Sequence, residues 1–112
     1  MQESFFDKSI EEWQQQREAF NELVLKDAPL ELKRFFSLDH QTYQAGALNE
    51  ATKELLGLVA SMVLRCDDCI LYHTLQCRDK GVSKAAFLEA CNIALLVGRS
   101  EERRVGKECR SR

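Results

Sequence analysis

Apolar residues recur every three or four positions along most of the chain, which is the spacing of one face of an α-helix. Over residues 4–25, Glu, Gln and Lys side chains separate a stripe made of Phe6, Ile10, Trp13, Phe20 and Val24. This stripe predicts a long amphipathic helix. Asp27 and Pro29 are suited to be the cap and an early residue of a second helix that ends near Leu38. A short helical turn is expected over residues 39–43, with its first residue, an aspartate, as the cap.

The second half of the chain has the same period with clearer start and stop signals. Asn49 is placed to cap a long apolar helix, whose interior Gly57 costs about 1 kcal/mol relative to alanine and so indicates close packing against a neighbour. The next helix is expected to stop at Gly81. Ser83 can cap the last one, which is predicted to end at Gly98. Because no strand-like alternation is present, we predict an all-α fold of about five to six helices.

Length and composition narrow the class of protein. The chain has 112 residues, 45% of them hydrophobic, which suits one domain with a modest core. No apolar run reaches the roughly 18 residues of a membrane span, and the start MQESFFDKS lacks the features of a secretory signal. A cytoplasmic location is therefore expected. Thiols are kept reduced there, so the five cysteines indicate catalytic use, metal binding or core packing rather than a disulfide framework.

The last fourteen residues differ from the rest in composition and charge. Residues 99–112, RSEERRVGKECRSR, carry six Lys or Arg against three acids, whereas residues 1–98 carry ten against fifteen. The acidic main part excludes nucleic-acid binding, which depends on basic side chains at phosphates. The tail resembles the translation of a common sequencing-library adapter. We therefore predict a helical domain over 1–98, truncated before a final helix, and a non-native, disordered tail over 99–112.

A C-x-x-C motif, Cys66 and Cys69, stands where one apolar helix ends and the next begins. At a helix N-terminus, unpaired N–H groups and the macrodipole favour a thiolate. One helical turn separates the two side chains, so a disulfide can form without large movement of the backbone. The pair is therefore suited to attack on a peroxide or a disulfide, followed by resolution by the neighbouring thiol.

Two further side chains are candidates for proton transfer. His73 lies four residues after Cys69, on the same helical face, where an imidazole can accept or return a proton. Glu54 lies on the preceding helix among leucines. If that face is buried, the carboxyl is a candidate general acid or base. The alternative, an exposed acid near a helix start, is equally compatible with the periodicity.

The same cysteines could instead form half of a zinc site. His73 and Cys77 would be the further ligands, but four ligands crowded along one helix give poor tetrahedral geometry. We therefore expect neither a metal nor a cofactor. Cys77 and Cys91 lie on apolar helical faces, which favours core packing, and a surface or capping role is expected for His40.

The ordered set E-x(11)-C-x-x-C-x(3)-H, formed by Glu54, Cys66, Cys69 and His73, resembles the signature of the alkylhydroperoxidase D and carboxymuconolactone decarboxylase superfamily. The resemblance implies a peroxiredoxin-type, antioxidant oxidoreductase that oligomerises, often as a trimer or hexamer. It implies that Cys69 attacks the peroxide, that Cys66 closes the redox-active disulfide, and that Glu54 and His73 relay protons. Reduction is expected from a dithiol protein, lipoylated or thioredoxin-like.

The chain departs from alkylhydroperoxidase D at one position beside the dithiol. There the residue before the second cysteine is a histidine joined to the relay, whereas here it is Asp68, which opposes thiolate formation. Two other functions stay open at this point. One is a decarboxylase acting on a lactone acid, whose chemistry has no need of a dithiol, and the other is a non-enzymatic thiol or zinc protein.

Overall fold

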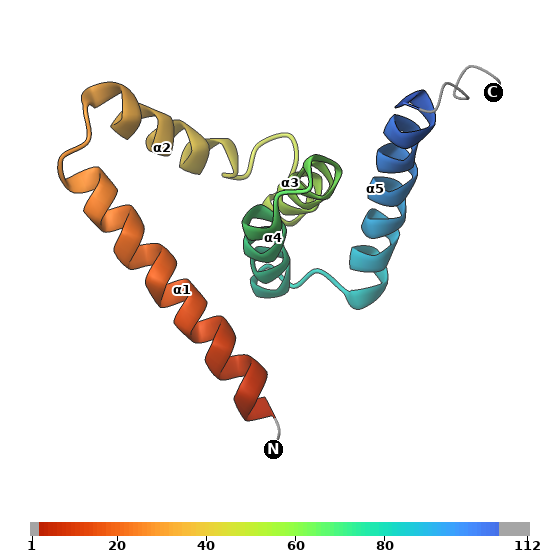
Figure 1. The fold of residues 1–112 in the computed structure, drawn as a ribbon, viewed down its shortest axis with the longest axis horizontal. Coiled ribbons are helices and arrows are strands. Elements are labelled where there is room, and N and C mark those ends of the chain that lie inside the picture. The colour runs from red at the N-terminus through yellow and green to blue at the C-terminus, as the bar shows by residue number, and fades with distance from the viewer. Residues whose placement is uncertain (1–2, 106–112) are drawn as a thin grey trace. The chain divides into compact units, whose positions relative to one another are not determined.

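The computed structural model describes the backbone of residues 3–105 and the side chains of residues 8–98. Five helices and no strand occur in this range, which confirms the predicted all-α fold (Figure 1). None of these helices is long and apolar enough to cross a membrane. The helices are α1 (Glu3–Lys26), α2 (Leu30–Thr42), α3 (Glu50–Leu64), α4 (Asp67–Asp79) and α5 (Lys84–Val105).

Helices α1 and α2 belong to one compact unit that ends at Thr42, and a second unit begins at Tyr43. In the first unit, no described side chain is buried, and several large apolar ones are well exposed: Phe20, Leu23, Leu30, Phe35 and Leu38. Helix α2 continues unbroken through Asp39, so the predicted separate turn is wrong. An aspartate costs less than about 0.7 kcal/mol inside a helix, which is too little to end one that can continue its hydrogen bonds.

Local hydrogen bonds and backbone conformation define the two ends of α3. The side chain of Asn49 accepts a hydrogen bond from the Thr52 N–H at 2.8 Å, which confirms the predicted cap. At the other end Arg65 takes a left-handed conformation, with φ of 61°, and its N–H bonds to carbonyls of the last turn. This turn reverses the chain, so α4 begins immediately after α3.

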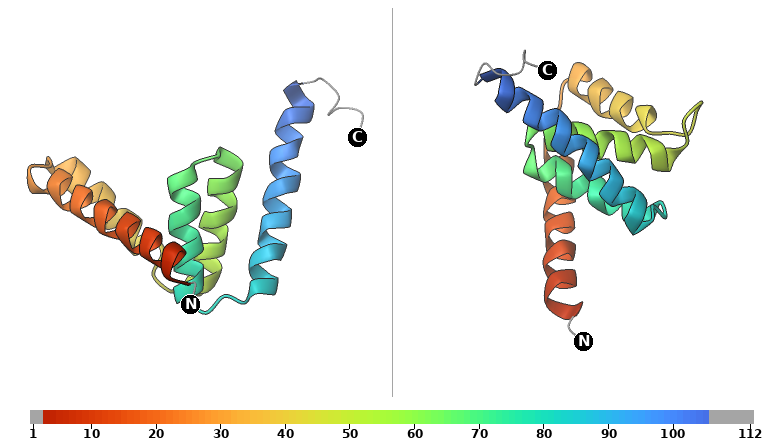
Figure 2. Two further views of the ribbon diagram at one scale, coloured as in Figure 1. Left: turned by 60° about the horizontal axis from the view of Figure 1, so that its bottom comes forward. Right: turned by 90° about the vertical axis from the view of Figure 1, so that its right-hand side faces the viewer.

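Helix α3 packs against both α4 and α5, and the three form the second unit (Figure 2). The ends of α3 and α4 that lie far from their short connection are joined by an ion pair, with Lys80 Nζ 3.0 Å from Glu50 Oε1. All three helices contribute to the small apolar core, which consists of Leu58, Leu75, Cys77, Ala90 and Ala94. The core therefore lies around α3, and it fixes the face that α3 presents to α4.

The connection from α4 to α5 follows the sequence signals, but the end of α5 does not. Gly81 has φ of +81°, a conformation that side chains rarely adopt, and Ser83 Oγ accepts from the Ala86 N–H at 3.0 Å. Helix α5 was expected to end at Gly98, yet its backbone is helical through Val105. The rest of the predicted tail, residues 106–112, lies outside the described residues.

Candidate active site

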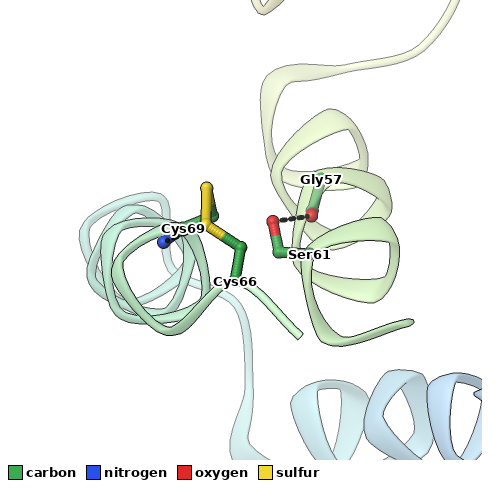
Figure 3. The surroundings of a disulfide bond; sticks show 4 residues. All are labelled: Gly57, Ser61, Cys66 and Cys69. Atoms are coloured by element: carbon green, nitrogen blue, oxygen red, sulfur yellow. Dashed lines mark hydrogen bonds between the residues drawn. A yellow bond between two sulfur atoms is a disulfide. The ribbon is translucent and has the colours of Figure 1, made fainter. Parts of the chain in front are cut away.

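The dithiol lies at the N-terminus of α4, as the sequence predicted. Cys66 is the N-cap residue, and its sulfur accepts a hydrogen bond from the Cys69 N–H at 3.3 Å (Figure 3). The two cysteines form a disulfide, with their Cα atoms 5.3 Å apart. Cys69 is exposed, whereas Cys66 is half-buried. The disulfide is therefore open to a reactant on the Cys69 side and supported by the helix on the Cys66 side.

Two opposing electrostatic effects act on these sulfur atoms. The first-turn N–H groups and the macrodipole of α4 favour negative charge at Cys66 and Cys69. Asp67 and Asp68 lie exposed in the same turn and repel it. Both carboxylates are in contact with water, which screens their charge. The hydrogen bond from the Cys69 N–H, in contrast, acts on the Cys66 sulfur at short range and in a fixed direction.

Glu54 on α3 and His73 on α4 form a buried pair. His73 Nδ1 lies 2.8 Å from Glu54 Oε1, and the two residues are 9% and 3% exposed. The exposed alternative for Glu54 is thus wrong, because the packing of α3 on α4 turns this position inward. An ionised carboxylate only accepts hydrogen bonds, so in that state Nδ1 donates this one, and Nε2 is the ring nitrogen that Glu54 does not contact.

Ser61 also belongs to the site, although its place in the sequence carried only a weak signal. It is buried, and its hydroxyl donates to the Gly57 carbonyl at 2.7 Å. Its own carbonyl accepts from the Cys66 N–H at 3.1 Å, and its side chain lies beside the disulfide (Figure 3). Ser61 therefore fixes the start of α4 against α3. A small polar residue within an apolar helix would have been the only signal for it.

Gly57 has the close neighbours that the sequence predicted, and they are side chains of the site. A Cβ atom at this position would lie 2.7 Å from His73 Cε1 and 2.7 Å from the hydroxyl of Tyr43. Side chains in real structures do not approach so closely, so alanine cannot be accepted here unless these groups move. The interior glycine was a usable signal in the sequence, whereas Tyr43 had none.

The remaining candidates are separate from the reactive pair. Cys77 is buried, as expected, and burial, Glu54 and Cys91 together raise the pKa of its thiol. Cys91 is only half-buried, and His40 lies on the surface as predicted. Within the described part of the chain, no group of three or more His, Cys, Asp or Glu side chains is arranged to hold a metal ion.

These differences in burial predict an order of thiol reactivity. In the native protein with its Cys66–Cys69 bond intact, we expect a maleimide to label Cys91 readily and Cys77 more than about a hundredfold more slowly, since a buried thiol that stays protonated is a poor nucleophile. Peptide mass mapping after timed quenching measures both rates. Equal labelling of the two thiols before denaturation would contradict the buried position of Cys77.

The fold and site together define an all-helical protein with a dithiol at a helix N-terminus and a buried histidine–carboxylate pair one turn away. The model of the carboxymuconolactone decarboxylase family matches residues 29–105. The chain belongs to this family. A comparison with curated proteins gave no match.

Solved structures similar to this chain share its helical arrangement. Two crystal structures of one protein from Thermotoga maritima have 44% and 43% sequence identity to it and TM-scores of 0.76 and 0.74. Both matches cover 89% of this chain, and they cover 91% and 88% of the other. The second is that of a "carboxymuconolactone decarboxylase family protein possibly involved in antioxidative response". A protein from Methanobacterium thermoautotrophicum shares the fold at 22% identity, with a TM-score of 0.64 over 73% of this chain and 94% of its own.

Proposed function

We propose that this protein is a thiol-dependent peroxidase or disulfide oxidoreductase, in which Cys66 and Cys69 cycle between dithiol and disulfide. The observation that carries the proposal is the buried contact between His73 Nδ1 and Glu54 Oε1, one helical turn from an accessible dithiol. A structural dithiol needs no buried acid and base beside it. Buried acidic and basic groups next to a nucleophile are typical of catalytic sites.

The oxidising half of the cycle assigns a role to each of the four residues. His73 Nε2 takes the proton of the Cys69 thiol, and the Glu54 carboxylate stabilises the imidazolium. The Cys69 thiolate attacks the terminal oxygen of a hydroperoxide, the O–O bond breaks, and the proton returns to the leaving alkoxide as an alcohol forms. Cys66 then attacks the Cys69 sulfenic acid, which releases water and closes the disulfide.

The reducing half requires a dithiol partner, lipoylated or thioredoxin-like. Its thiolate attacks the sulfur of Cys69, the more exposed of the two residues, and the Cys66 sulfur leaves as a thiolate that the Cys69 N–H already contacts. The second thiol of the partner then attacks the mixed disulfide. The partner ends as a disulfide and this protein as a dithiol, so two electrons and two protons are transferred.

Decarboxylation of a lactone acid, the reaction in the family's name, is the alternative. It transfers no electrons between thiols and would leave both cysteines unchanged during turnover. The dithiol therefore supports the redox proposal over this one, because its position at an accessible helix N-terminus would serve no step of a decarboxylation.

The test is a thiol count on the reduced protein before and after one equivalent of cumene hydroperoxide, with peptide mapping of the product. The loss of two thiols into a Cys66–Cys69 bond, with the other three thiols, Cys77, Cys91 and Cys109, unchanged, is expected. If all five thiols survive, the peroxidase proposal fails. Incubation of the disulfide form with dihydrolipoamide then tests disulfide exchange independently, because its reduction needs no peroxide.

We also propose that the protein assembles with copies of itself, as a trimer or a hexamer. Exposed large apolar side chains on the second unit support this, since exposed apolar surface on this scale marks interaction sites. They are Leu48, Leu56, Leu64, Leu88, Ile93, Leu95, Leu96 and Val97. Sedimentation equilibrium measures the mass, and a monomer at all concentrations would exclude this proposal.

A further inference from the structure

A third side chain lies against the Glu54–His73 pair. The ring centroid of Tyr43 is 5.3 Å from that of His73, and the two ring planes are tilted by 38°. Tyr43 is the first residue after α2 and is half-buried. It has no part in the proposed reaction, and it lies outside the set of residues that the sequence pattern connects.

Gly57 shows where the Tyr43 hydroxyl lies relative to the imidazole. The point at which a Gly57 Cβ would stand is 2.7 Å from the Tyr43 hydroxyl oxygen and 2.9 Å from His73 Nε2. Both polar atoms therefore occupy the space that the missing side chain leaves over α3. The other ring nitrogen, Nδ1, is directed to Glu54. The hydroxyl thus lies near the one nitrogen that Glu54 does not hold.

We propose that Tyr43 is a positioning residue for His73, holding the Nε2 side of the ring while Glu54 holds the Nδ1 side. Nε2 has one lone pair, so the hydroxyl can donate to it only until Nε2 takes up a proton, and it can then accept from Nε2–H of the imidazolium. The ring then keeps one orientation before and after a proton moves. The expected effect of Tyr43 on the reaction rate rests on the proposed function, but its effect on the orientation of the His73 ring does not.

The substitution Tyr43→Phe removes the hydroxyl and keeps the aromatic ring. Tyr72→Phe is the matched control, because the Tyr72 ring also contacts His73, with ring centroids 5.2 Å apart and ring planes at 74°, whereas the atoms nearest to the Gly57 Cβ position belong to Tyr43 and His73. Rates of disulfide formation with cumene hydroperoxide are measured from pH 5 to pH 9. We expect Tyr43→Phe to lower the limiting rate about tenfold and to displace the midpoint of the pH profile by about half a unit or more. Tyr72→Phe should stay within about twofold of the wild type.

A spectroscopic measurement separates this inference from the proposed activity. The chain has two histidines, so ¹⁵N-labelled protein gives one set of ring signals for His73 and one for the exposed His40, which serves as an internal control. In the wild type we expect neutral His73 to be a single tautomer with hydrogen on Nδ1. Tyr43→Phe should shift the Nε2 resonance and mix the tautomers, and Tyr72→Phe should not.

The outcomes are distinct. An unchanged Nε2 resonance and an unchanged pH profile in folded Tyr43→Phe protein would overturn the role of Tyr43. If the wild type does not react with peroxide at all, the peroxidase part of the proposed function fails, and the resonance alone then decides the role of Tyr43. The double variant Tyr43→Phe, Gly57→Ala is a second test. Its loss in rate, expressed as a free energy, should be smaller than the sum of the two single losses, because both changes disturb the same Nε2 contact. Fully additive losses would count against it.

Discussion

Replacing Cys69 by serine is expected to abolish the reaction with hydroperoxide, with a loss of at least roughly a thousandfold in the rate of oxidation. A serine hydroxyl is far less acidic than a thiol, so His73 cannot generate a nucleophile of comparable strength from it. Cys69 is exposed and lies in the first turn of α4, so its replacement should leave the fold intact, and circular dichroism checks this. The measurement is the rate of peroxide consumption with dihydrolipoamide as the reductant.

Two further cysteine variants make this result specific. Cys91→Ser makes the same replacement of sulfur by oxygen on α5, away from the dithiol, and should keep the wild-type rate. Cys66→Ser should still consume one equivalent of peroxide, leaving Cys69 as a sulfenic acid that dimedone traps. Trapping at Cys66 in the Cys69→Ser protein, instead of at Cys69 in the Cys66→Ser protein, would reverse the two roles.

Glu54→Gln has the second largest expected effect, a loss of about a hundredfold in the rate at neutral pH. The amide has nearly the same shape as the carboxylate and can still accept from His73 Nδ1–H, but it has no charge to stabilise an imidazolium. Because the residue is only 3% exposed, removing its charge removes a desolvation cost as well. We therefore expect the melting temperature to stay unchanged or to rise while the activity falls.

The matched control for this variant lies one turn earlier on the same helix. Glu50→Gln removes a carboxylate that pairs with Lys80 near the surface, where an ion pair contributes little. Its rate should remain that of the wild type. Equal losses in the two variants would mean that the general charge of α3, rather than the buried contact with His73, supports the reaction. A Glu54→Gln protein with full activity would remove Glu54 from the mechanism.

The positions of the helix ends and of the dithiol could be predicted because they depend on neighbours in the sequence. The Asn49 and Ser83 side chains bond to N–H groups three residues ahead, and Gly81 supplies a conformation that its own lack of a side chain permits. Cys69 and His73 share a face because four residues make about one helical turn. The two boundary errors, at Asp39 and Gly98, occurred where the local preference for a break is weak.

The sequence by itself therefore determined the helical class, the dithiol at the start of a helix and the register of His73 with it. Only the tertiary structure decided that Glu54 is buried and meets His73 across nineteen residues of sequence, and that Gly57 makes room for Tyr43. The physical reason is that a contact within one turn follows from helix geometry alone, whereas a contact between helices depends on which faces the core brings together. Here the packing of α3 against α4 and α5 determines which helix faces meet.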